Sequence, residues 1–177
     1  DRLITAPHDG ASWTCRRGPF DAPDFEALPD HGWTLLIQEA DRKVDACAAL
    51  LDRFRIVPNW RVDDEMVSYA TDGGGVGPHI DRYDVFLIQA LGQRRWRIGS
   101  DPLHDESLDP GAEIPILSRF QPEEEWILGP GDALYLPPRI AHEGVAVGAC
   151  GTCSVGFRVP DPRELCAGFL RQLPPSA

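Results

Sequence analysis

Short apolar segments separated by turn residues occupy the middle of this chain. Five of them have strand length: Met66 to Ala70, Asp84 to Leu91, Arg94 to Ile98, Ala133 to Leu136 and Cys153 to Val159. The segments between them lack the long helical pattern that a parallel crossover needs, so we expect an antiparallel sheet folded as a sandwich or barrel. The unbroken apolar run from Val85 to Ile88 predicts a strand that is buried on both faces.

Two other stretches carry apolar side chains at helical spacing. The first runs from Asp41 to Phe54, with Asp41 as its expected N-cap. The second runs from about Asp161 to Leu173, where Pro162 suits the first turn, and we expect it to cover one end of the fold. The apolar faces consist of Val44, Cys47, Leu51 and Phe54 in the first helix and Leu165, Phe169 and Leu173 in the second.

The strand from 94 to 98 has an unusual inward face. Residues two apart lie on one side of a strand, so Arg94 points the same way as Trp96 and Ile98, while Arg95 and Arg97 point the other way. A guanidinium facing the interior is costly unless an anion is held with it. Either an acidic side chain or a ligand supplies that anion, or else Arg94 extends past its neighbours to solvent.

Composition narrows the function classes. The 177 residues fit a single domain, 1–177, and the 17 glycines and 17 prolines favour a β-rich fold with many turns. The net charge of -11 repels phosphate backbones, which argues against direct nucleic-acid binding; it would attract a basic partner, or serve only solubility. No apolar run approaches the roughly 18 residues of a spanning helix, and no signal peptide precedes the domain, so we expect a cytoplasmic protein without membrane partners.

The cysteines indicate a reducing compartment. There are five of them, an odd number without the spacing of a disulfide scaffold. Cys150 and Cys153 have the spacing of a redox motif or of half a zinc site, but no second close pair completes a tetrahedral site. The simpler interpretation is two small residues in a buried strand.

Candidate metal ligands come from two separated segments. In Gly73-Gly-Gly-Val-Gly-Pro-His-Ile-Asp81, His79 and Asp81 are two apart and reach the same point from an extended chain. In Gly131-Asp-Ala-Leu-Tyr-Leu-Pro-Pro-Arg-Ile-Ala-His142, a second histidine follows another strand and turn. Two histidines and one carboxylate form the facial triad of non-haem Fe(II) oxygenases, which leaves coordination positions open for co-substrate and dioxygen.

The spacing around these histidines strengthens the assignment. The glycine, proline and histidine positions of the second segment reproduce the second cupin motif, and the interval from Gly73 to His79 reproduces the start of the first. The usual cupin has a fourth ligand, a glutamate, where this chain has Val85, which favours an oxygenase. We expect the remaining histidines, His8, His31 and His104, to lie on the surface.

Longer matched stretches extend the likeness to nearly the whole chain. They are Asp63-Asp-Glu-Met-Val-Ser-Tyr69, Gly73 to Phe86, Arg94-Arg-Trp-Arg97, Leu134-Tyr-Leu-Pro-Pro138, His142-Glu-Gly144 and Ser154-Val-Gly-Phe-Arg158. In these stretches the sequence resembles the bacterial ribosomal oxygenases, which are JmjC-type, cupin-fold enzymes that hydroxylate an arginine of a large-subunit ribosomal protein. The resemblance implies a mainly β fold, a double-stranded β-helix or jelly roll with a few flanking helices.

The resemblance also implies roles for single residues. His79, Asp81 and His142 match the Fe(II) ligands, and Arg94 matches the residue that binds the distal carboxylate of 2-oxoglutarate, the co-substrate used together with dioxygen. Ser68 is a candidate for the same co-substrate, with core packing as its alternative role. The other candidates are Thr152, which stands where the family often has Asn near the co-substrate, and Tyr83 and Asp84 as contacts for a substrate guanidinium.

Family members resembling this chain are longer. They carry additional residues before the position of Asp1 and a dimerisation and winged-helix region after the position of Ala177, so we expect a homodimer for the longer protein. The expected partner is a basic ribosomal protein. Two other functions stay open: a JmjC hydroxylase that acts on histidine or on a different protein, and a cupin that binds a metal without catalysis.

Overall fold

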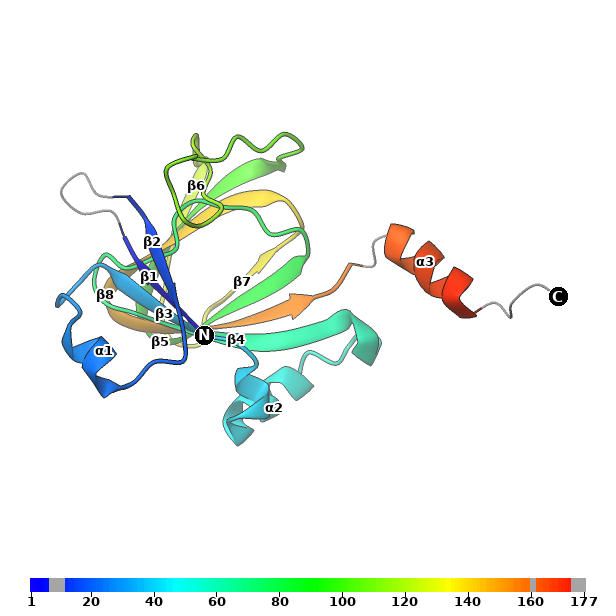
Figure 1. Ribbon diagram of the computed structural model, residues 1–177, viewed down its shortest axis with the longest axis horizontal. Coiled ribbons are helices and arrows are strands. Elements are labelled where there is room, and N and C mark those ends of the chain that lie inside the picture. The colour runs from blue at the N-terminus through cyan, green and yellow to red at the C-terminus, as the bar shows by residue number, and fades with distance from the viewer. Residues whose placement is uncertain (7–11, 160–161, 173–177) are drawn as a thin grey trace.

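A curled antiparallel sheet forms the centre of the computed structural model, which describes residues 1–6, 12–159 and 162–172 (Figure 1). The strand order is β2-β1-β3-β4-β8-β5-β6, and β7 pairs with β5. The strands are β1 (Arg2–Thr5), β2 (Thr14–Arg17), β3 (Trp33–Ile37), β4 (Val62–Ala70), β5 (Asp84–Pro102), β6 (Glu124–Leu128), β7 (Ala133–Leu136) and β8 (Ile140–Phe157). The helices are α1 (Ala22–Glu26), α2 (Asp45–Asp52) and α3 (Pro162–Gln172), with 3₁₀ turns η1 (Ala40–Arg42) and η2 (Asn59–Arg61).

The pairings between the named strands are all antiparallel, which confirms the predicted sheet type. Two expected strands, 84–91 and 94–98, are halves of the single long strand β5. The register shifts on either side of Leu91, and Gly92 adopts a φ of +61° that favours glycine. The irregularity bends the strand without ending it, so β5 pairs with β8 along both halves.

The inward face of β5 is as predicted. Arg94, Trp96 and Ile98 are 3%, 5% and 7% exposed, so Arg94 does not extend to solvent. Val85 and Leu87 pack in the core cluster that contains Trp96 and Ile98. On the opposite face of the strand, Phe86 and Ile88 pack against a second cluster, whose buried members are Leu51, Val62, Val155 and Phe157. The run from 85 to 88 therefore contacts apolar side chains on both faces.

The two predicted helices begin later or lie elsewhere than expected. The first is shorter: α2 begins at Asp45 with Val44 as its N-cap, so the assignment of Asp41 as the cap is wrong. The Asp41 carboxylate instead accepts the backbone N–H of Glu65 at 3.1 Å, which ties η1 to β4. Asp41 lies within the 3₁₀ turn η1, which ends before the helix begins.

The second helix, α3, begins at Pro162, although Asp161 and Leu173 lie outside the described residues. It does not cover one end of the fold, because Figure 1 shows it standing away from the sheet. Leu165 and Phe169 on its apolar face are 58% and 66% exposed. Across the residues described, no helix has both the length and the apolar composition needed to cross a membrane.

The cysteine and histidine expectations can be checked for the described part of the chain. Cys150 and Cys153 are free thiols buried in β8, as the simpler interpretation predicted. His31 and His104 are exposed, and His8 lies outside the described residues.

Candidate functional site

The two histidines of the predicted triad face each other across an isolated antiparallel bridge. The His79 N–H donates to the His142 carbonyl at 3.0 Å, and the His142 N–H donates to the His79 carbonyl at 2.9 Å. His142 belongs to β8, whereas His79 lies in the loop between β4 and β5. Glycines let that loop approach, since a Cβ on Gly75 would lie 2.6 Å from the Gly144 oxygen of β8.

Both imidazoles are oriented by the same local hydrogen bond. Nδ1 of His79 lies 2.9 Å from the Gly77 carbonyl, and Nδ1 of His142 lies 2.9 Å from the Ile140 carbonyl. A carbonyl can only accept, so Nδ1 carries the proton in each ring and Nε2 presents a lone pair. Burial and the neighbouring His79 lower the pKa of His142 to about 3, which keeps its ring neutral. Neutral imidazoles with one fixed nitrogen are the form that binds metals.

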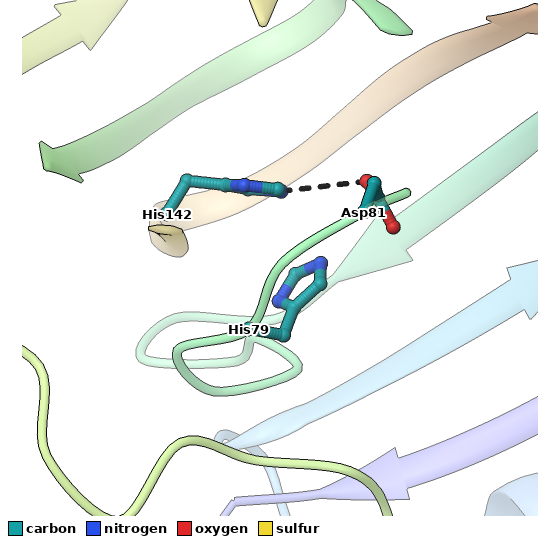
Figure 2. Close-up of side chains that lie close together, drawn as sticks. All are labelled: His79, Asp81 and His142. Carbon is teal, nitrogen blue, oxygen red and sulfur yellow. Dashed lines mark ion pairs between the residues drawn. The ribbon is translucent and has the colours of Figure 1, made fainter. Parts of the chain in front are cut away.

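Asp81 completes the cluster (Figure 2). Its carboxylate lies 3.6 Å from Nε2 of His142, and one ligand atom from each of the three side chains lies within 4.8 Å of the others. Burial raises the pKa of Asp81, while His79 and a hydrogen bond from Tyr83 oppose that rise. A partly buried carboxylate beside two lone pairs gives a donor set of N, N and O that suits a transition metal.

A cavity of about 260 Å³ opens beside this cluster. Its wall includes all three clustered side chains together with Arg94 and Trp96 of β5. Both Nε of Arg94 and Nε1 of Trp96 are buried donors without a hydrogen-bond partner among the described residues. Buried donors are seldom left unpaired in folded proteins, so this end of the cavity is suited to an anionic or carbonyl-bearing ligand.

The other predicted co-substrate residues also line the cavity. Ser68 of β4 accepts a hydrogen bond from Nη2 of Arg94 at 3.3 Å and donates to the Thr152 carbonyl at 3.4 Å. The Thr152 hydroxyl donates to the Gln89 side-chain oxygen at 3.0 Å. Ser68 thus orients the guanidinium, whereas the Thr152 hydroxyl is already engaged.

The structure separates the two candidates for substrate contact. Tyr83 lines the cavity, and burial together with the nearby Asp81, Asp64 and Asp63 raises the pKa of its phenol. Tyr83 therefore stays protonated. Asp84 is not part of the cavity wall, because its carboxylate accepts the Tyr135 hydroxyl at 2.6 Å on β7.

Some cavity residues were not singled out from the sequence. Trp96 was placed facing inward, but its free indole N–H was not recognised as part of a site. Ile114 and Pro115 come from the long loop after β5, and Gln38 follows β3. Neither segment carries a motif, since both contribute to the wall only after the sheet curls.

Comparison with known proteins agrees with this geometry. A family model described as the JmjC domain matches residues 49–165. The chain is 42% identical over 168 residues to the ribosomal protein uL16 3-hydroxylase of Escherichia coli, which covers 95% of this chain and 44% of that protein. It is 38% identical over 169 residues to a probable ribosomal oxygenase of Haemophilus influenzae, covering 95% of this chain and 41% of that protein.

Solved structures give the same result. The X-ray structure of E. coli YcfD superimposes with a TM-score of 0.85 at 38% identity and covers 99% of this chain and 50% of that chain. A structure of E. coli YcfD with cobalt and 2-oxoglutarate gives a TM-score of 0.82 at 38% identity, with 99% and 48% coverage.

The match to the JmjC family covers more than half of the chain, so the chain belongs to the JmjC domain family. It has the mainly antiparallel JmjC/cupin fold that the sequence resemblance implied. It spans about half the length of the relatives it matches.

Proposed function

We propose that this chain carries the catalytic domain of an Fe(II)- and 2-oxoglutarate-dependent oxygenase that hydroxylates an arginine of a large-subunit ribosomal protein. The observation that carries the proposal is a cavity whose wall contains both a cluster of two histidines and one aspartate and two residues, Arg94 and Trp96, each with a buried donor that has no partner among the described residues. The cluster suits a metal, and the donors suit a carboxylate. A structural cupin needs no such second feature.

His79, Asp81 and His142 would hold the metal through two Nε2 atoms and one carboxylate. Three protein ligands leave positions open, and iron bound with 2-oxoglutarate supplies the activation of dioxygen. The neutral state of His142 supports binding, because no proton has to be displaced from its Nε2 at neutral pH. The structure of the related E. coli protein YcfD contains cobalt and 2-oxoglutarate, which supports a metal and 2-oxoglutarate as the ligands of this cavity.

The co-substrate carboxylate would be held by Arg94. A guanidinium binds a carboxylate through parallel donors, and Ser68 restricts the position of Nη2. Trp96 adds a donor on the same wall. Because Arg94 is 3% exposed, water competes little for this ion pair, which strengthens the interaction.

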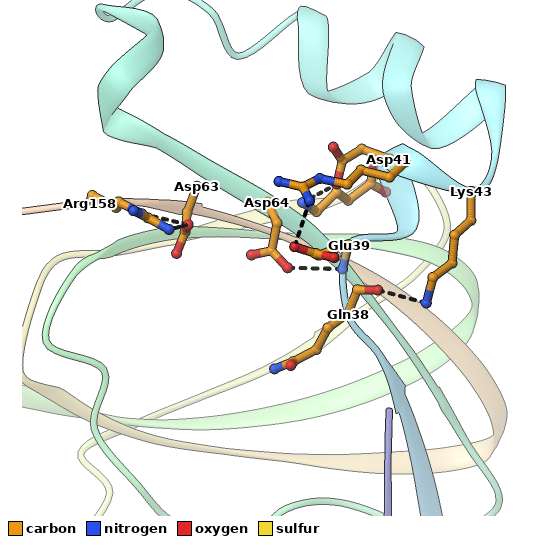
Figure 3. Close-up of polar contacts among 9 residues, drawn as sticks. Gln38, Glu39, Asp41, Lys43, Asp63, Asp64 and Arg158 are labelled. Atoms are coloured by element: carbon orange, nitrogen blue, oxygen red, sulfur yellow. Dashed lines mark hydrogen bonds and ion pairs between the residues drawn. The ribbon is translucent and has the colours of Figure 1, made fainter. Parts of the chain in front are cut away.

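The net charge of -11 favours a cationic substrate. Gln38 lines both the cavity and a neighbouring surface groove of mixed charge, in which Glu39, Asp63 and Asp64 lie together with Arg42, Lys43 and Arg158. Figure 3 shows part of this groove: Asp64 accepts the Glu39 N–H at 3.0 Å, and Asp63 pairs with Arg158. Tyr83 would contact the substrate side chain where it enters the cavity. The name of the E. coli relative, which specifies ribosomal protein uL16, supports a ribosomal protein as the acceptor.

The co-substrate assignment is tested by succinate formation from 2-oxoglutarate with Fe(II) and a uL16 peptide. Arg94→Met should raise the KM for 2-oxoglutarate by about 10-fold or more, since a hydrogen bond to a charged group contributes roughly 1.5–3 kcal/mol. Arg95→Met is the matched control, because the neighbouring guanidinium is exposed on the opposite face of β5. Equal KM values for the two variants would rule out Arg94 as the anchor.

A further inference from the structure

One carboxylate outside the cavity connects the two segments that carry the clustered histidines and aspartate. Oε1 of Glu106 accepts Nη2 of Arg82 at 3.2 Å and Nη2 of Arg139 at 3.3 Å. Arg82 directly follows Asp81, and Arg139 stands three residues before His142. A single oxygen atom therefore bridges the loop that bears Asp81 and the turn that leads to His142.

Arg139 is the more constrained partner of Glu106. Its φ of +70° lies in the left-handed region, which a residue with a side chain adopts only when surrounding contacts hold it there. Its N–H donates to the Asp81 carbonyl at 2.6 Å, and its carbonyl accepts the Leu103 N–H at 2.9 Å. Its Nε also donates to the Leu103 carbonyl at 2.6 Å. Arg139 thus contacts the Asp81 backbone directly, and its side chain is hydrogen-bonded to Leu103 at the start of the loop after β5.

Burial distinguishes the two ion pairs. The side chains of Glu106 and Arg139 are 18% and 26% exposed, whereas that of Arg82 is 75% exposed. Exposed ion pairs contribute little, because water screens them and two long side chains lose freedom. The Glu106–Arg139 pair therefore carries most of the connection.

The same loop also forms part of the cavity wall. It folds back on itself, with the Ser118 N–H donating to the Ser107 carbonyl at 2.8 Å. The Leu117 N–H donates to the Pro78 carbonyl, next to His79, at 2.8 Å. Pro115, two residues before Leu117, lines the cavity. Glu106 thus anchors one end of a loop whose other end touches the His79 segment.

We propose that Glu106 is a positioning residue for the His79–Asp81–His142 cluster. Through Arg139 it fixes the distance between the two ligand-bearing segments and so preorganises the cluster for a cation. The inference rests on the proposed function only in requiring that the cluster binds a metal. It assigns no contact between Glu106 and the metal or the substrates.

The test is titration of the purified chain with Co²⁺, followed by the visible absorption of the bound ion. Glu106→Gln retains the size of the side chain but loses its charge. We expect it to bind Co²⁺ about 3- to 30-fold more weakly, the range typical of residues that act through a connected network. Asp52→Asn is the control, because it removes an exposed ion pair with Arg55 at the C-terminal end of α2, and its Co²⁺ affinity should match wild type.

A second variant reaches the same ion pair from its other side. Arg139→Gly removes the guanidinium while relieving the left-handed backbone, so it should fold and should also weaken Co²⁺ binding. In the double variant the two losses should be less than additive, since both substitutions remove the same Glu106–Arg139 ion pair. Unchanged Co²⁺ affinity in both single variants, whatever their thermal stability, would overturn the positioning role. A failure of the metal-site assignment itself would be distinguishable from a failure of the Glu106 role, because wild type and His79→Ala would then give the same weak Co²⁺ signal.

Discussion

His79 and His142 hold each other in place through paired backbone hydrogen bonds, and their ring centroids lie 4.3 Å apart. Neither bond uses a side chain. The spacing of the two histidines is therefore set by backbone pairing between β8 and the glycine-rich loop, and Nε2 of each ring remains available as a ligand.

This relationship predicts that loss of a ligand leaves the fold intact. Asp81→Asn should weaken binding of Fe(II) or Co²⁺ by more than about 100-fold, since replacing even a residue behind a ligand often costs 10- to 100-fold. The thermal midpoint of the metal-free protein should change little. Metal content after dialysis checks the loss of binding, and a thermal melt followed by circular dichroism checks the stability. Retention of metal at the wild-type level would exclude Asp81 as a ligand.

Trp96 should contribute to co-substrate binding through its indole N–H. Trp96→Phe keeps an aromatic ring in the core but removes the unpartnered Nε1 donor. A neutral hydrogen bond contributes roughly 0.5–1.5 kcal/mol, so the Kd for 2-oxoglutarate should rise about 2- to 10-fold. Calorimetric titration of the Co²⁺-loaded protein measures this. An unchanged Kd would show that the indole N–H does not reach the ligand.

Gly144 should be required for the position of Arg94. A Cβ at this site would lie 2.6 Å from a Trp96 ring carbon and 3.0 Å from Cδ of Arg94. The added methyl group would displace Arg94, so Gly144→Ala should weaken 2-oxoglutarate binding by about 5-fold or more, besides the loss of stability of about 1–3 kcal/mol that overpacking costs. Gly129→Ala is the matched control, since its nearest contact is a side-chain oxygen at 3.8 Å. Equal affinities in the two variants would contradict this requirement.

Glu65 should make stability depend on pH. Its side chain is fully buried on β4 beside the thiols of Cys47 and Cys153. Burial raises its pKa above the ordinary 4.5 and Asp41 adds to the rise, while the two thiols oppose it. The folded state then binds more protons than the unfolded state, so the free energy of unfolding should fall as pH rises from about 4.5 through the raised value.

Glu65→Gln should remove that contribution to the pH slope in urea unfolding. Glu65→Leu should also raise the free energy of unfolding at neutral pH by about 1–3 kcal/mol, because two buried oxygens lack a hydrogen-bond partner among the described residues. Identical pH slopes in wild type and Glu65→Gln would show that Glu65 titrates as in the unfolded chain.

The sequence was most informative where a local pattern decides the outcome. Alternation along residues 94–98 placed Arg94 inward, and the structure finds it buried. The spacing of His79 and Asp81 predicted a shared point, and the structure brings both near His142.

The sequence was less informative where distant contacts decide. Asp41, the expected helix cap, instead accepts a hydrogen bond from the N–H of Glu65 on β4, which is 24 residues away in sequence. Likewise, nothing local marks Glu106 as a bridge, because its partners come from two other segments. The strands β1 and β3 were also not predicted, yet Ile4 and Leu36 line the cavity.

The central claim is that this cavity couples Fe(II) and 2-oxoglutarate to oxidation of a ribosomal protein. The most direct measurement is the intact mass of a uL16 peptide after aerobic incubation with the chain, Fe(II) and 2-oxoglutarate, with His79→Ala as the control. We predict the gain of one oxygen atom with wild type alone, located on an arginine by fragmentation. An oxygen on histidine would contradict the arginine assignment, and no gain on intact uL16 or its peptides would contradict the proposed function.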